Sequence, residues 1–278
     1  MTIGAGAYMG LGTFIEGYRI ADLQWGTASG KYAVLRFCAS IINASGRSDR
    51  TWCVALRNQP SISHSYVIPI KSSGNDYTNK EFTFIIPPPP TSTWATDNNY
   101  GLTITFMSHV GSTFQTSSPS TWVSGNFFGT NDITDVPGGS FVDYLSFSDV
   151  GFYADPNMTG RAPEFQQNEY VDDHTECLRY WYKAFGLSGV VQSATILRLV
   201  GPHPVPMRVP PSVSLVGTTL RCYDTAVAPN ATSVSIPAAY TQSLDIQLTA
   251  SAGGFTLGRA AKLLLDGQEA NYVAVSAR

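Results

Sequence analysis

The sequence predicts an all-β protein built as an antiparallel sandwich or barrel. Apolar and polar residues alternate with a period of two over many short segments, as the opposite faces of a strand require. Gly, Pro, Ser and Asn separate those segments, and turn residues between many short strands are typical of sandwiches and barrels. Helical spacing is best matched near the middle of the chain, where a strand fits as well.

The first two strands are expected at 34–40 and 51–57. Their apolar faces carry Leu35, Phe37 and Ala39 in the first, and Trp52, Val54 and Leu56 in the second. The run N-A-S-G-R-S at 43–48 is rich in turn residues and is expected to connect the two strands.

If this connection is a hairpin, Cys38 and Cys53 lie nearly opposite each other on adjacent strands. By parity both side chains point away from the face of Phe37 and Trp52. The two thiols either pair or stay free. Free thiols are favoured for a protein assembled in a reducing cytosol.

Four further strands are expected in the N-terminal part, at 66–70, 81–86, 102–107 and 141–154. The last reads as one long bent strand or two short ones. The inward residues of the middle pair are Phe82, Phe84 and Ile86, and Leu102, Ile104 and Phe106. Four consecutive prolines at 87–90 cannot donate to a sheet and form a stiff linker or strand end.

The segment 169–185 reads equally well as helix and strand, and the composition changes after it. Prolines then separate a second set of strands, expected at 212–216, 219–223, 243–249, 262–265 and 271–275. We therefore expect two domains, one at 1–175 and a smaller β module at 176–278.

Composition excludes several classes of partner. Lys plus Arg number 17 and Asp plus Glu 20, which gives a net charge of −3, so the basic footprint of a nucleic-acid-binding protein is missing. Charged residues make up 13% of the chain, against roughly 25% in ordinary domains. The surface is therefore polar but nearly uncharged, and suits contacts made by hydrogen bonds and stacking.

Membrane insertion and secretion are not indicated. No segment approaches the roughly 18 consecutive apolar residues of a membrane span. No basic region precedes an apolar stretch at the start of the chain, so no signal peptide is recognised. The four cysteines are too few and too scattered for a disulfide scaffold.

No motif for catalysis is found, and we expect no enzyme. The glycines at 4–10 are spaced one residue too widely for a dinucleotide fingerprint and are expected to serve close strand packing. The histidines (His64, His109, His174 and His203) are isolated in sequence. Glycoside hydrolysis needs two carboxylates flanking one bond, and its candidates are Asp143, Asp149, Asp155, Glu164, Glu169 and Glu176. Sequence proximity does not make them a catalytic pair, so a polysaccharide depolymerase stays an alternative.

The loop at 94–100 is the candidate binding site. Trp94 and Tyr100 offer flat apolar rings, and Asp97, Asn98 and Asn99 offer hydrogen-bonding groups that complement a sugar ring. The three Asx residues could instead surround a structural Ca²⁺ ion; no other cofactor is expected. In the third interpretation Trp94 packs into the end of the sandwich and the Asx residues form turns.

Several segments, taken in order, resemble a jelly-roll module of bacteriophage virion proteins. They are D-L-Q-W-G-T-A-S-G at 22–30, V-A-L-R-N at 54–58, T-W-A-T-D-N at 93–98, T-W at 121–122 with N-F-F-G-T at 126–130, V-G-F-Y at 150–153, A-P-E-F at 162–165, C-L-R-Y-W-Y at 177–182, and P-V-P-M-R at 204–208 with P-P-S-V at 210–213. Such modules occur in tail fibres, head fibres and related receptor-binding proteins, and are similar in fold to carbohydrate-binding modules.

The resemblance implies a jelly-roll β-sandwich at 1–175, a location in the virion after assembly in the bacterial cytoplasm, and recognition of host surface polysaccharide. It also implies other virion proteins as partners, and a homotrimer would add avidity. A purely structural capsid decoration or fibre connector is the alternative. One or two strands of the family's module precede the matching residues and are expected from another polypeptide or are absent. Leu178 stands where the family usually has Gln.

Overall fold

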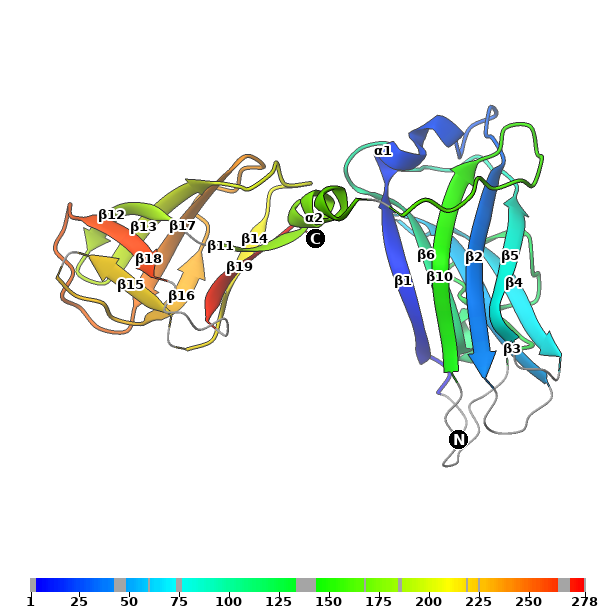
Figure 1. Ribbon diagram of the computed structural model, residues 1–278, viewed down its shortest axis with the longest axis horizontal. Coiled ribbons are helices and arrows are strands. Elements are labelled where there is room, and N and C mark those ends of the chain that lie inside the picture. The colour runs from blue at the N-terminus through cyan, green and yellow to red at the C-terminus, as the bar shows by residue number, and fades with distance from the viewer. Residues whose placement is uncertain are drawn as a thin grey trace. The chain divides into compact units, whose positions relative to one another are not determined.

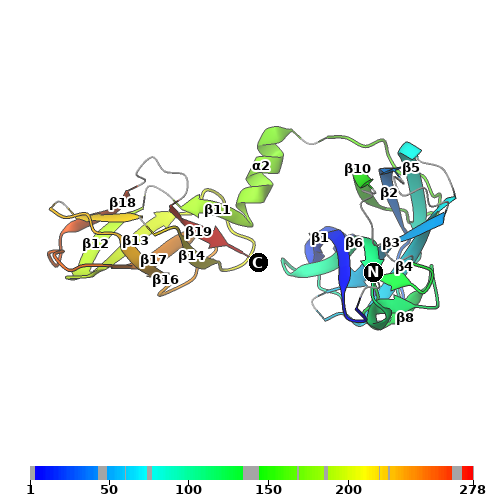
Figure 2. The same ribbon diagram turned by 90° about the horizontal axis from the view of Figure 1, so that it is seen from below.

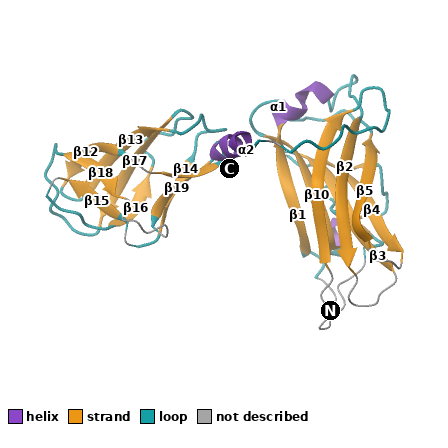
Figure 3. Ribbon diagram, viewed as in Figure 1, coloured by secondary structure: helices purple, strands orange, loops and turns teal. Residues whose placement is uncertain are grey.

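Strands dominate the computed structural model, which confirms the predicted all-β class (Figures 1 and 3). The structure describes residues 4–42, 49–59, 61–73, 77–133, 144–167, 169–184, 187–218, 220–224, 226–264 and 271–277. The chain divides into two units, Met1–Gln166 and Gln167–Arg278. The division precedes the boundary expected near residue 175, which falls inside a helix of the second unit.

The first unit contains two antiparallel sheets. In spatial order, the five-stranded sheet consists of β1 (Tyr8–Glu16), β6 (Tyr100–Val110), β3 (Asp49–Asn58), β4 (His64–Ser73) and β8 (Trp122–Ser124). The three-stranded sheet consists of β10 (Tyr144–Ala154), β2 (Ala33–Ile42) and β5 (Tyr77–Ile86). The remaining elements are α1 (Gly17–Ile20), the 3-10 turns η1 (Ala21–Leu23) and η2 (Ser112–Phe114), and the short parallel pair β7 (Gln115–Thr116) and β9 (Gly129–Thr130).

The main core of the first unit lies between these sheets, which Figure 2 shows on opposite sides of the unit. Phe37 of β2 packs against Trp52 of β3 and Phe106 of β6, with ring centroids 6.0 and 5.1 Å apart. The predicted inward faces of these strands are confirmed, since all the residues assigned to them are buried. On β5, Ile86 is buried and both phenylalanines pack partly buried against the same core.

The five-stranded sheet is also covered on its other face, by the segment that follows β6. Cys53, Val67 and Met107 point to this side and pack with Phe128. A strand with two buried faces has no polar face, which is why β3 contains a buried residue at every position from Thr51 to Asn58.

The expected pairing of the Cys38 and Cys53 strands is wrong. β2 pairs with β10 and β5, whereas β3 pairs with β4 and β6, so the two cysteines belong to different sheets. Both thiols are free and buried. The connection at 43–48 lies outside the described residues. A turn-rich connection between strands looks the same in sequence whether the chain stays in one sheet or crosses to the other.

β1 begins within the glycine-rich start of the chain. The expectation of close strand packing is confirmed for Gly10 but wrong for Gly4 and Gly6, where a β-carbon would meet no atom within 4 Å. A β-carbon at Gly10 would clash with the backbone oxygen of Phe106, and one at Gly12 would lie 2.6 Å from the Thr105 side chain. The long bent strand expected at 141–154 corresponds to β10, where the register shifts between Ser148 and Gly151 and Asp149 has a positive φ of 54°. Residues 141–143 of that prediction lie outside the described residues.

The second unit begins with helix α2 (Tyr170–Leu178), followed directly by β11 (Trp181–Ala184). One sheet contains β11, β19 (Tyr272–Ser276) and β14 (Ser212–Val216). The other contains β15 (Arg221–Asp224), β18 (Ala260–Leu264), β12 (Ser188–Ser193), β13 (Ile196–Pro202), β17 (Ser243–Ala250) and β16 (Ala231–Ser235). Leu197, Leu199 and Ile246 are fully buried in its own core. The ambiguous segment 169–185 is thus a helix and a strand in succession.

Candidate functional site

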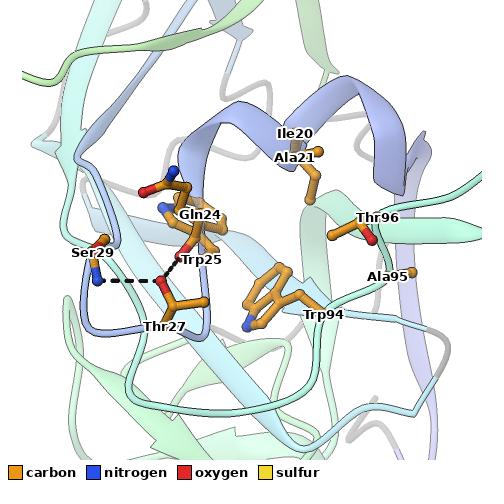
Figure 4. Close-up of a pocket in the computed structure, with 9 residues that line it drawn as sticks. All are labelled: Ile20, Ala21, Gln24, Trp25, Thr27, Ser29, Trp94, Ala95 and Thr96. Atoms are coloured by element: carbon orange, nitrogen blue, oxygen red, sulfur yellow. Dashed lines mark hydrogen bonds between the residues drawn. The ribbon is translucent and has the colours of Figure 1, made fainter.

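A cavity of about 390 Å³ opens at one end of the first unit (Figure 4). Its lining comes from two stretches that are far apart in sequence: the run from α1 to the turn after η1, and the loop between β5 and β6. The lining residues are Ile20, Ala21, Gln24, Trp25, Thr27, Ser29, Trp94, Ala95 and Thr96.

The wall formed by α1 is fixed by the loop before β6. The carbonyl oxygens of Asn99 and Asp97 accept hydrogen bonds from the backbone amides of Gly17 and Tyr18, both at 2.8 Å. The Asp97 carboxylate in turn accepts bonds from the backbone and side-chain nitrogens of Asn99, at 2.9 and 2.7 Å. The two bonds to Gly17 and Tyr18 satisfy backbone amides in the first turn of α1, which have no partner within the helix.

Trp25 and Trp94 form the floor of the pocket. Their rings meet edge to face with centroids 5.0 Å apart, and Trp122 packs against both, at 5.6 and 5.8 Å. Each buried indole nitrogen has an acceptor: Trp25 donates to the Lys31 carbonyl at 2.7 Å and Trp94 to the Ser92 hydroxyl at 3.0 Å. The floor is therefore rigid, apolar and saturated in its own hydrogen bonds.

The rim is polar and carries no charge. Thr27 donates its hydroxyl to the Gln24 carbonyl at 2.7 Å and accepts the Ser29 amide at 3.2 Å, which shapes the turn on one side of the opening. Among the described residues, the carboxamide of Gln24 and the hydroxyls of Ser29 and Thr96 have no hydrogen-bonding partner and remain available to a ligand. No Asp, Glu, Lys or Arg lines the pocket.

Of the five residues predicted for the site, the structure places only Trp94 in the pocket. Asp97, Asn98 and Asn99 are exposed beyond its lining. Tyr100 lies at the start of β6, where its ring stacks on Phe14 of β1 with centroids 4.5 Å apart. Trp94 is only 8% exposed and packs into the core at the end of the sandwich, as the third interpretation expected, while the part of it that stays accessible lines the pocket. The Asp97 carboxylate forms a turn with the Asn99 amide.

Sequence reasoning missed the residues of 20–29 as part of a site. Trp25-Gly26 occurs among the segments that carry the family resemblance, but nothing local to that run shows that it meets the loop at 94–96. The local signal in the sequence is the Trp25-Gly26 pair followed by small and polar residues, which suits a turn. The structure places Gln24 there at a positive φ of 52°.

Asp155, one of the candidate carboxylates, holds a loop together, and no metal cluster is found in the described residues. No group of three or more His, Cys, Asp or Glu side chains suited to a metal is found among those residues. Asp155 is buried and accepts the backbone amides of Thr159 and Gly160 at 2.9 and 2.7 Å, which lowers the pKa of its carboxyl and anchors a loop. Asp143 lies outside the described residues.

Comparisons with known proteins add no relative. A scan against models of protein families found no match, and searches of curated proteins and of solved structures found none either. No helix among the described residues is long and apolar enough to cross a membrane.

Proposed function

We propose that the first unit is a carbohydrate-binding module whose pocket holds one ring of an uncharged saccharide. The observation that carries the proposal is a tryptophan floor under a rim of amide and hydroxyl groups. A sugar ring has an apolar C–H face edged by hydroxyls, which is the complement of that arrangement. The cavity volume of about 390 Å³ falls in the range of roughly 300–1,000 Å³ typical of small-molecule sites.

The absence of charge in the lining narrows the class of saccharide. An acidic sugar would lose hydration of its carboxylate in the pocket without gaining a cation among the lining residues, which is costly. A neutral hexose or amide-bearing sugar loses hydration only at uncharged hydroxyl and amide groups, which Gln24, Ser29 and Thr96 replace. Neutral ligands are therefore expected to bind in preference to uronic or sialic acids.

The resemblance to phage virion modules supports a wider role for this binding. In that role the protein is a fibre or spike component of a virion, and host surface polysaccharide is its ligand. A single pocket that holds one sugar ring gives weak binding, so a homotrimer attached to other virion proteins would provide the avidity that adsorption needs.

Affinity electrophoresis in gels containing neutral or acidic polysaccharide tests the proposal. Thr96→Trp fills the pocket mouth from an exposed position, while Thr91→Trp adds the same ring to an exposed position of the same loop outside the lining. Neutral polysaccharide should retard the unmodified protein and Thr91→Trp but not Thr96→Trp. Equal retardation of the two variants, or retardation by acidic polysaccharide alone, would contradict it.

A purely structural virion component is the second candidate, and the surface of β1 favours it. Tyr8, Met9, Leu11 and Phe14 are 55%, 64%, 70% and 51% exposed, which is unusual for apolar residues on one strand. Under this alternative no polysaccharide retards the protein in the same gels.

A further inference from the structure

The two sheets of the first unit do not match in width on the side of β1 and β10. Both strands are edges: β1 pairs only with β6, and β10 pairs only with β2 among the described strands. The rings of Phe147 on β10 and Phe106 on β6 lie 4.2 Å apart, so β10 faces β6 across the core. Because β1 is the next strand after β6, the sheet position that faces β1 lies beyond β10.

Among the described residues, nothing covers the inner face of β1 at Met9 and Leu11. Leu11 pairs with Phe106 in the register of β1 and β6, so its side chain points to the core side of the sheet. Met9 lies on the same face two residues away. Leu11 is nevertheless 70% exposed and Met9 64% exposed, whereas Phe106 beside them is only 7% exposed.

We propose that β10 accepts one extended segment of a separate polypeptide as an added strand, which covers Met9 and Leu11. The open backbone of an edge strand selects an extended partner, since only a strand satisfies its amides and carbonyls in a ladder. The added strand would continue the existing core, next to Leu145 and Phe147, which pack partly buried against it.

The same geometry sets the chemistry of the partner. Side chains that face Met9 and Leu11 must be apolar. Those on the other side continue the polar face of β10, where Ser146 and Ser148 are exposed. No charged residue occurs in 8–15 or 145–148, so the part of the partner that covers Met9 and Leu11 alternates apolar and polar residues and needs no compensating charge there.

The edge of a second folded copy does not fit this position. A second β10 placed beside the first would bring its own β6 opposite, into the space that β1 occupies. Turning that copy over avoids the overlap but directs Ser146 and Ser148, rather than apolar residues, at Met9 and Leu11. A segment without a covering sheet of its own meets neither obstacle.

Selection from a displayed library of peptides of about ten residues, the upper end of ordinary strand lengths, tests the proposal with the full chain as bait. Leu11→Lys is the test variant. Leu257→Lys is its control, because Leu257 in the second unit is 71% exposed and so closely matches Leu11. Both variants should fold as the unmodified chain does, since neither side chain is buried.

Selected peptides should alternate apolar and polar residues and slow amide hydrogen exchange in β10. Their affinity should fall about tenfold or more on Leu11→Lys, the loss expected for one buried leucine, and stay unchanged on Leu257→Lys. Peptides that bind Leu11→Lys equally well, or no enriched peptide at all, would overturn the proposal. It would also be overturned if the chain alone self-associates in light scattering and Leu11→Lys disperses it, because the occupant would then be a second copy.

Discussion

At the scale of residues, Gly26 determines how closely the two halves of the pocket approach. Its φ of 81° is in the left-handed region, which glycine adopts without strain. A β-carbon there would clash with the Ser92 backbone oxygen and lie 2.5 Å from the Trp94 ring. The turn after η1 can therefore lie against the loop at 92–94 only because residue 26 has no side chain.

Gly26→Ala is expected to destabilise the first unit by about 1–3 kcal/mol, through backbone strain and the displaced Trp94. Chemical denaturation followed by tryptophan fluorescence measures the change. Gly6→Ala is the control, because a β-carbon at Gly6 would meet no atom within 4 Å. Equal stability of the two variants would show that the loop adjusts freely and does not depend on Gly26.

At the scale of elements, the two sheets of the second unit are joined by a buried pair. Tyr182 of β11 and His203, just after β13, are within 2.6 Å at the tyrosine hydroxyl and histidine Nδ1. His203 Nε2 donates to the Tyr240 carbonyl at 3.0 Å, which leaves Nδ1 to accept the tyrosine proton. Burial lowers the pKa of His203 below its ordinary value of 6.5, so the folded unit holds the neutral ring.

The free energy of unfolding should therefore depend on pH through His203. The unfolded chain binds a proton near pH 6.5 and the folded unit does so only at lower pH, so stability is full above pH 6.5 and falls as the pH decreases below it. The loss reaches at most about 1.4 kcal/mol per pH unit for one proton. Denaturation between pH 7.5 and 5 should show a steeper decline for the unmodified chain than for His203→Gln. Parallel declines would exclude His203 as the cause.

The strands that sequence predicted best are those with one apolar face in regular alternation. β2, β5 and β6 have such faces, and their inward residues were predicted correctly. β1 was not predicted as a strand. Its two glycines and the apolar residues on its outward face obscure the alternation of apolar and polar residues that marks a strand. The sequence also did not predict which sheet each strand joins. Alternation shows which face of a strand is buried but not which strand lies beside it, and the strands of Cys38 and Cys53 were therefore expected to be neighbours.

Only part of the candidate site was predicted, because local sequence does not show which distant segments meet. Trp94 was identified because an aromatic residue among uncharged polar residues suits a sugar. Asp97 and Asn99 suit the same ligand, but they equally suit a turn, and in the structure the Asp97 carboxylate binds Asn99. Their backbone carbonyls, which carry no sequence signal, accept the amides of Gly17 and Tyr18. Trp25 reaches the pocket through contacts that no local pattern encodes.

At the scale of the whole molecule, each unit has a core of its own. The buried clusters of the first unit contain residues up to Ile133, and that of the second contains residues from Tyr182 onward. Leu56 and Leu199 are both fully buried, one in each unit.

Leu56→Ala and Leu199→Ala should each destabilise one unit by about 2–5 kcal/mol through loss of buried area and a residual cavity. Calorimetry of the full chain should show two transitions, and each substitution should lower the midpoint of a different one. A single transition that both substitutions lower equally would mean that the units unfold as one.

The most direct test of saccharide binding is saturation-transfer NMR from protein aromatic protons to neutral saccharides, because it reports whether a ligand's C–H groups lie against tryptophan. Transfer should occur with the unmodified chain and with Tyr100→Ala, and should disappear with Thr96→Trp. Loss of transfer on Tyr100→Ala with retention on Thr96→Trp would move the site to the loop at 97–100. No transfer to any neutral saccharide would contradict carbohydrate binding by this unit.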